Sequence, residues 1–193
     1  MSNLKELTKE QHTTAERQAF VKVLMSGNIH PDFYATYLWN QHKKYDLIEA
    51  LAIAQGLFVG LPIDIRRKLP IEQDFLELWK REEAPVILPS TEEYMMHMKD
   101  KLTDTDAIMA HIYVLHMGDL SGGQMIAKKI PGEGRMYKFE GDVAATKEAI
   151  RAKTHDGMAD EARKCFEFST KLFQELMELD CEHYLEPSDT VSE

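Results

Sequence analysis

The sequence has little of what defines several common protein classes. Its 193 residues include two cysteines, Cys165 and Cys181, too few for a disulfide-stabilised secreted domain and without the second pair that a structural zinc site uses. No apolar run approaches the ~20 residues that cross a bilayer, and no charged segment followed by an apolar one opens the sequence. We therefore expect a soluble, cytoplasmic protein without a membrane anchor.

Basic residues are also scarce. The chain has 23 Lys and Arg against 33 Asp and Glu, a formal charge of -10, and no dense Lys/Arg block, which argues against nucleic acid as a partner. No flavin or nicotinamide fingerprint is present, so neither cofactor is expected to be bound. With 44% hydrophobic and 29% charged residues, the composition is that of one globular domain.

Strand-like alternation is nearly absent, and helical periodicity dominates. The pattern predicts an all-α, single-domain bundle of about seven helices over residues 1–185, followed by a polar tail over 186–193. Ser90 to Glu93 has the sequence of a capping box, and the Thr and Asp residues at 103–106 predict another helix start. The expected helices cover residues 3–26, 31–55, 66–81, 91–102, 105–129, 143–154 and 158–184.

Three glycines interrupt the fifth of these helices. Gly118, Gly122 and Gly123 each cost a helix roughly 1 kcal/mol relative to alanine. Gly118 and Gly122 are four residues apart, so they share one face and leave a shelf without Cβ atoms. Close packing of two helices explains such a shelf, and so does a flat ligand. Asp119 and Ser121 beside the glycines favour a site with bound water.

The eight histidines do not form a dinuclear or hydrolytic metal motif. Neither Glu-x-x-His nor His-Glu-x-x-His occurs, which leaves single histidines as candidates for one axial heme ligand. His12 is followed at i+4 by Glu16, whose carboxylate can orient the imidazole. A simple surface pair explains the same spacing equally well.

Several segments resemble the heme oxygenase family. The run Gly-Asp-Leu-Ser-Gly-Gly-Gln at 118–124 matches that family's distal helix without a change, and KELTKEQHTTAE at 5–16 is similar to the segment with its proximal ligand. Arg67-Lys68 with Glu72-Gln73-Asp74, and then Phe166 and Phe173, continue the resemblance in the family's order over almost the whole chain.

The resemblance implies a heme oxygenase-like bundle and assigns roles at the iron. His12 is similar to the proximal iron ligand and Glu16 to its partner. Gly118 resembles a glycine that touches the heme face, and Asp119 the carboxylate that anchors distal water, with Tyr45 in the same network.

The remaining implied heme contacts lie around the ring. Arg151 and Lys153 lie where the family places propionate-binding cations, and the alignment leaves His155 as an alternative. The other implied heme-binding positions are Lys5, Tyr113, Ser121, Gly122, Phe166 and Phe173. For the two phenylalanines, core packing is an equally simple explanation.

The implied reaction is oxidative cleavage of heme at the alpha-meso carbon to biliverdin IXalpha, carbon monoxide and ferrous iron. Oxygen is consumed, and the electrons come from a ferredoxin or a flavoprotein reductase, for which Lys5, Lys9, Arg17 and Lys22 offer a basic docking surface. A heme carrier or sensor without turnover is the first alternative. A thiaminase-like hydrolase with a cysteine nucleophile is the second, although Cys165 has no histidine at helical spacing.

One position departs from the family pattern. Where many members have an arginine shortly before the glycines, this chain has Leu115, followed by His116. The arginine belongs to the polar network behind the aspartate, so the sequence leaves open whether His116 replaces it.

Overall fold

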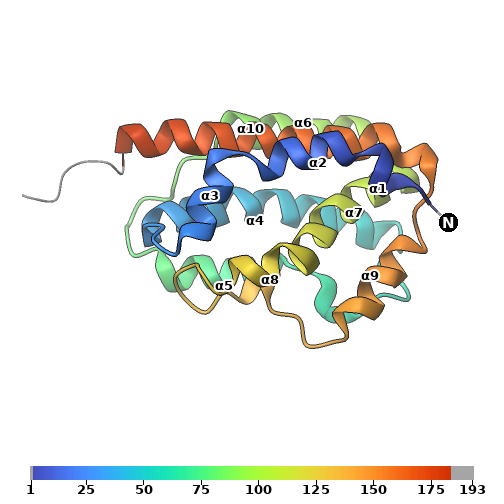
Figure 1. Cartoon of the computed structure of the whole chain (residues 1–193), viewed down its shortest axis with the longest axis horizontal. Coiled ribbons are helices and arrows are strands. Elements are labelled where there is room, and N and C mark those ends of the chain that lie inside the picture. Colours follow the sequence, from blue (N-terminus) through green and yellow to red (C-terminus); the bar gives the residue numbers. More distant parts are fainter. Residues whose placement is uncertain (1, 184–193) are drawn as a thin grey trace, which may run out of the picture.

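All regular structure in residues 2–183, the part of the chain that the computed structural model describes, is helical (Figure 1). The predicted all-α fold is therefore confirmed for these residues. Side chains are described through Leu179. The predicted tail at 186–193, the end of the last predicted helix at Tyr184 and the side chain of Cys181 lie outside the described residues.

Two long helices and α7 contact most of the other helices of the bundle. α10 (Ala159–His183) packs along α7 (Thr105–Ser121) and α6 (Pro89–Lys101), and α4 (Pro31–Ala54) packs against α5 (Lys68–Leu78), α6 and α7 (Figure 1). α4 is buried on most of its circumference because helices cover it from several sides. Three of the short elements are η1 (Ile63–Ile65), α9 (Val143–Arg151) and η3 (Asp156–Met158).

The single first helix predicted over residues 3–26 is wrong. The segment forms α1 (Leu4–Leu7), α2 (Lys9–Glu16) and α3 (Ala19–Ser26), with Gln18 in an extended conformation at ψ 147°. α2 and α3 both pack on α10. In an unbroken helix, Ala19 would lie on the same buried face as Ala15, four residues earlier. Because the helix breaks, Ala19 is exposed and Phe20 is buried instead.

The capping box predicted at residues 90–93 is also wrong. α6 begins at Pro89 without a side-chain cap, since Ser90 is used for a tertiary contact. Its backbone N–H donates to Glu175 Oε2 at 3.0 Å and its hydroxyl donates to the same oxygen at 2.5 Å. The start of α7 agrees with the prediction, because Asp104 accepts a hydrogen bond from the N–H of Ala107 at 2.8 Å.

The helix predicted to run through residue 129 ends earlier. α7 stops at Ser121, and α8 (Gly123–Ile126) leads to η2 (Arg135–Tyr137). A Cβ on Gly123 would lie 2.4 Å from Cδ1 of Tyr137, so this glycine allows the ring to pack on the helix. Close packing therefore accounts for Gly123.

Arg67 and Asp74, which belong to a segment that resembles the heme oxygenase family, bind the backbone at and just after η2. Arg67, only 2% exposed, donates from Nη1 to the carbonyl of Lys138 at 2.7 Å. Asp74 accepts from the N–H of Met136 at 2.8 Å. Within the described residues, no helix combines the length and the hydropathy needed to cross a membrane.

Candidate functional site

His12 lies on an exposed face of α2. Its side chain is 51% exposed, and Nδ1 lies 3.4 Å from Oε2 of Glu16. Among the described residues, Nε2 has no hydrogen-bond partner, and Phe166 of α10 contacts the imidazole edge-on at 5.5 Å between ring centroids. The imidazole is therefore supported on one side and free to bind on the other.

Gly118 and Gly122 border open space, unlike Gly123. A Cβ on Gly118 would have no atom within 4 Å, and one on Gly122 would meet only the carbonyl of Gly118 at 3.8 Å. Gly118 and Ser121 are exposed. α7, which bears this bare surface, and α2, which bears His12, both pack on α10.

Behind Gly118, a buried hydrogen bond joins α7 to α4. The hydroxyl of Tyr45 donates to Oδ2 of Asp119 at 2.6 Å, and the two residues are 1% and 6% exposed. Burial raises the pKa of Asp119 to about 6, although the Tyr45 hydrogen bond and the charge of His116 oppose it. Burial also raises the pKa of Tyr45 well above 10. Asp119 can therefore gain and lose a proton near neutral pH.

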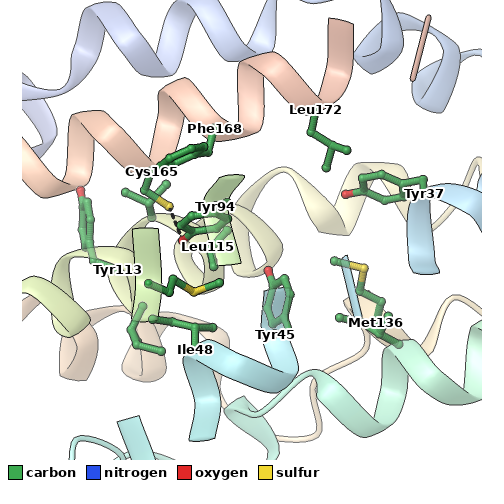
Figure 2. Close-up of a cluster of buried hydrophobic side chains, with 14 of the residues drawn as sticks. Tyr37, Tyr45, Ile48, Tyr94, Tyr113, Leu115, Met136, Cys165, Phe168 and Leu172 are labelled. Atoms are coloured by element: carbon green, nitrogen blue, oxygen red, sulfur yellow. Dashed lines mark hydrogen bonds between the residues drawn. The ribbon is translucent and has the colours of Figure 1, made fainter. Parts of the chain in front are cut away.

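His116, and not Leu115, extends this polar network. Its Nε2 lies 3.2 Å from Oε1 of Glu49, and its ring is 5.4 Å from that of Tyr45. Leu115 is buried among apolar side chains (Figure 2). The histidine thus occupies the polar position that the sequence left open.

Glu49 is a site residue that the sequence analysis missed. It is 3% exposed and accepts hydrogen bonds from the backbone N–H of Arg67 at 2.5 Å and of Lys68 at 3.3 Å. The available signal was its i+4 spacing from Tyr45 on one face of α4. Its partners come from α5 and α7, so the spacing alone could not identify them.

The predicted propionate contacts differ in their surroundings. Tyr113 is 8% exposed; burial raises the pKa of its hydroxyl, and the nearby charge of Arg151 partly offsets the rise. His155 instead pairs with Asp106, with Nε2 to Oδ2 at 2.8 Å. Lys5 is exposed on α1, and Lys153 is half-buried. Arg151 is itself paired with Glu148, with Nη1 to Oε2 at 3.1 Å. Both Arg151 and His155 therefore have acidic partners in this structure.

Phe166 and Phe173 have different environments. Phe166 meets His12, whereas Phe173 stacks on Phe20 at 5.6 Å between centroids. Phe173 therefore contributes to the core between α3 and α10.

Comparisons with known proteins agree with this fold. A family model described as heme oxygenase matches residues 1–175. Heme oxygenase 2 of Oryctolagus cuniculus is 31% identical over 207 residues, which cover 90% of this chain and 64% of that protein. Heme oxygenase 1 of Nostoc is 26% identical over 208 residues, covering 88% and 82%. The chain thus spans about 64% of the length of the heme oxygenase 2 relatives it matches.

Solved structures show the same architecture. The crystal structure of heme oxygenase-1 from the cyanobacterium Synechocystis in complex with heme has a TM-score of 0.80 at 24% identity, over 94% of this chain and 93% of that one. Heme oxygenase from Leptospira interrogans has a TM-score of 0.74 at 25% identity, over 89% and 97%. With the family match over most of its length, the chain belongs to the heme oxygenase family.

Proposed function

We propose that this chain is a heme oxygenase that binds heme between His12 of α2 and the bare surface of α7. It opens the ring at the alpha-meso carbon and forms biliverdin IXalpha, carbon monoxide and ferrous iron from heme, oxygen and external electrons. One observation carries the proposal: the open space at Gly118 is backed by the buried Tyr45–Asp119 hydrogen bond.

On the proximal side, His12 is the proposed iron ligand. Its Nε2 is free of protein partners among the described residues, and Glu16 accepts from Nδ1, directly or through water, which orients the ring. Bound heme supplies the iron that activates oxygen, and a histidine ligand promotes O–O cleavage less than a thiolate does. Phe166 limits the rotation of the imidazole.

On the distal side, the absence of side chains is the useful feature. Gly118 and Gly122 leave no acid–base group in direct contact with the oxygen, and they restrict which ring edge is accessible. With a pKa of about 6, Asp119 can take up and release a proton near neutral pH, and it passes that proton through ordered water. Tyr45 fixes the carboxylate, so Asp119, Gly118 and Tyr45 form the proposed catalytic group.

In this proposal, basic side chains bind the negatively charged heme propionates. Tyr113 and Arg151 lie close enough to interact electrostatically, and Lys5 and Lys153 complete the set. Ser121 and Gly122 continue the distal surface, and Phe173 supports the wall through α10.

A ferredoxin or a flavoprotein reductase is the proposed electron donor. Lys5, Lys9, Arg17 and Lys22 are all exposed on α1 to α3 or the turns between them, on the same segment as His12. Reversing the charges of Arg17 and Lys22 should slow donor-driven turnover and weaken its salt dependence. Ascorbate-driven turnover in the same variant is the control, and equal losses with both reductants would remove the docking role.

Heme titration followed by reduction tests the function. The wild type should give a Soret band that His12→Ala loses or shifts, whereas His155→Ala should keep the band position. Ascorbate and oxygen should then convert bound heme to biliverdin, detected by its absorbance and by chromatography of the isomer. Stable heme binding without conversion would instead identify a carrier or sensor. An unchanged Soret band in His12→Ala would overturn the ligand assignment.

A further inference from the structure

A second cluster of polar side chains lies where α6, α7 and α10 meet. Oε2 of Glu161 lies 2.9 Å from Nε2 of His97 and 3.0 Å from Nε2 of His111. One possible metal-ligand atom from each of the three residues lies within 4.8 Å of the other two. None of the three residues takes part in the heme site proposed above.

We propose that His97, His111 and Glu161 bind one transition-metal ion of the zinc type. Two imidazole nitrogens and one carboxylate oxygen are a common ligand set for Zn²⁺, at 2.0–2.2 Å from the metal. Tetrahedral ligands at that radius lie about 3.3 Å apart, so the 2.9 and 3.0 Å contacts to Glu161 need to lengthen by a few tenths of an ångström. The two imidazoles, whose ligand atoms lie within 4.8 Å of each other, need to approach the same spacing. The ion replaces the hydrogen bonds that now join the three side chains. The proton on each Nε2 moves to Nδ1 or is released to water, because only an unprotonated nitrogen can bind the metal.

The atoms behind His111 suit a metal ligand. Its Nδ1 lies 2.6 Å from the hydroxyl of Tyr94. That hydroxyl lies 3.3 Å from Sγ of Cys165, and Figure 2 shows this second contact. When Nε2 binds a metal, Nδ1 carries the proton and donates to Tyr94 Oη, and the Tyr94 hydroxyl can donate to Cys165. Metal-bound histidines usually have such a partner on the second nitrogen, which fixes the tautomer and the ring.

The exposure of the cluster allows an ion to enter and a fourth ligand to bind. The side chain of His111 is 0% exposed, that of His97 is 14% and that of Glu161 is 33%. Phe168 packs against the His97 ring at 5.3 Å and against Tyr94 at 4.7 Å between centroids. Two ligands are thus held by packing, while the carboxylate side is open to water, which can supply the fourth position.

Zinc titration of the full-length, heme-free, chelator-treated protein tests the proposal. Calorimetry should give one zinc ion per chain for the wild type, and Co²⁺ should give the intense visible bands of a tetrahedral site. His97→Ala and Glu161→Gln should each abolish this stoichiometric binding. Tyr94→Phe keeps all three ligands and should weaken binding roughly 10-fold, the effect of losing an outer hydrogen bond.

Two other histidines provide matched controls. His155 forms a similar pair with Asp106 at 2.8 Å but belongs to no three-ligand group among the described residues, and His12 faces Glu16. His155→Ala and His12→Ala should therefore retain the zinc affinity. Far-UV circular dichroism checks that each variant is folded. The proposal is overturned if the wild type binds no stoichiometric zinc, or if folded His97→Ala and Glu161→Gln bind it as tightly as the wild type.

Discussion

Two regions of α7 each contain a residue that contacts a tyrosine hydroxyl, but the carboxylates of the two regions have opposite pKa shifts. Near its end, Asp119 accepts from Tyr45 at 2.6 Å; two turns earlier, His111 lies 2.6 Å from the hydroxyl of Tyr94. Each region contains a carboxylate, Asp119 itself or Glu161 of α10. Burial raises the pKa of Asp119 to about 6, whereas hydrogen bonding to His111 lowers that of Glu161 to about 2 against the effect of burial.

The partners explain this difference. Asp119 is buried and directly bonded to one neutral hydroxyl, which only partly replaces water around a carboxylate. Glu161 is one-third exposed and receives contacts from two imidazoles, which stabilise its charge. A hydrogen bond to a tyrosine hydroxyl therefore does not by itself decide whether a nearby carboxylate is charged. The first region suits proton transfer, and the second suits a fixed negative charge.

The largest difference between the regions is expected in catalysis. Asp119→Asn should lower ascorbate-driven biliverdin formation by at least ~100-fold, because general acid–base groups contribute about that much, while keeping the Soret band. Glu161→Gln should leave turnover unchanged. Single-turnover absorbance measurements compare them, and full activity in Asp119→Asn would remove the proton-transfer role.

The Glu161→Gln and Asp119→Asn substitutions should have different effects on the free energy of unfolding at pH 7.5. Glu161→Gln loses charge-assisted hydrogen bonds to a buried imidazole and should reduce the free energy of unfolding by roughly 1–3 kcal/mol. Asp119→Asn removes a buried charge and should leave that free energy unchanged or raise it. Urea unfolding in the presence of a chelator measures both. Equal losses would show that the two carboxylates are electrostatically alike.

The pH dependence of stability should separate the regions further. The pKa of Asp119 is raised in the folded state from 3.8 to about 6, so its ionisation destabilises the fold above pH 6, and this cost disappears as the pH falls toward 4. The advantage of Asp119→Asn over the wild type should therefore shrink by roughly 1–2 kcal/mol between pH 7.5 and 5. Tyr45, Glu49, His116 and Arg67 surround the carboxyl in both proteins, so unfolding curves of the pair isolate its contribution. An advantage that is constant with pH would contradict the raised pKa.

The smallest expected effect concerns the open surface beside Asp119. Gly118→Ala should raise the free energy of unfolding by up to ~1 kcal/mol, because alanine favours the helix and its Cβ meets no atom within 4 Å. Gly123→Ala is the control and should lose stability against Tyr137. Thermal unfolding compares the two, and a loss in Gly118→Ala would mean that this face is packed.

Some features could be predicted because they depend on near neighbours in the sequence. Helical periodicity gave the all-α class, and the i+4 spacing placed Glu16 beside His12. Residues within four positions of one another share a helical face wherever the helix finally packs. The contact of Tyr45 with Asp119 was expected only through the family resemblance, since 74 residues separate them.

The sequence by itself therefore determined the all-α class, the start of α7 and the glycine-rich segment, but not the breaks within residues 3–26 or the early end of α7. The tertiary structure decided which glycine is packed against Tyr137 and which faces open space, and it directed Ser90 to Glu175 instead of a helix cap. It also joined His116 to Glu49, and His97 to Glu161. The physical reason is that a hydrogen-bond partner or a steric limit depends on which distant side chains are buried together, and the local helical pattern carries no information about that pairing.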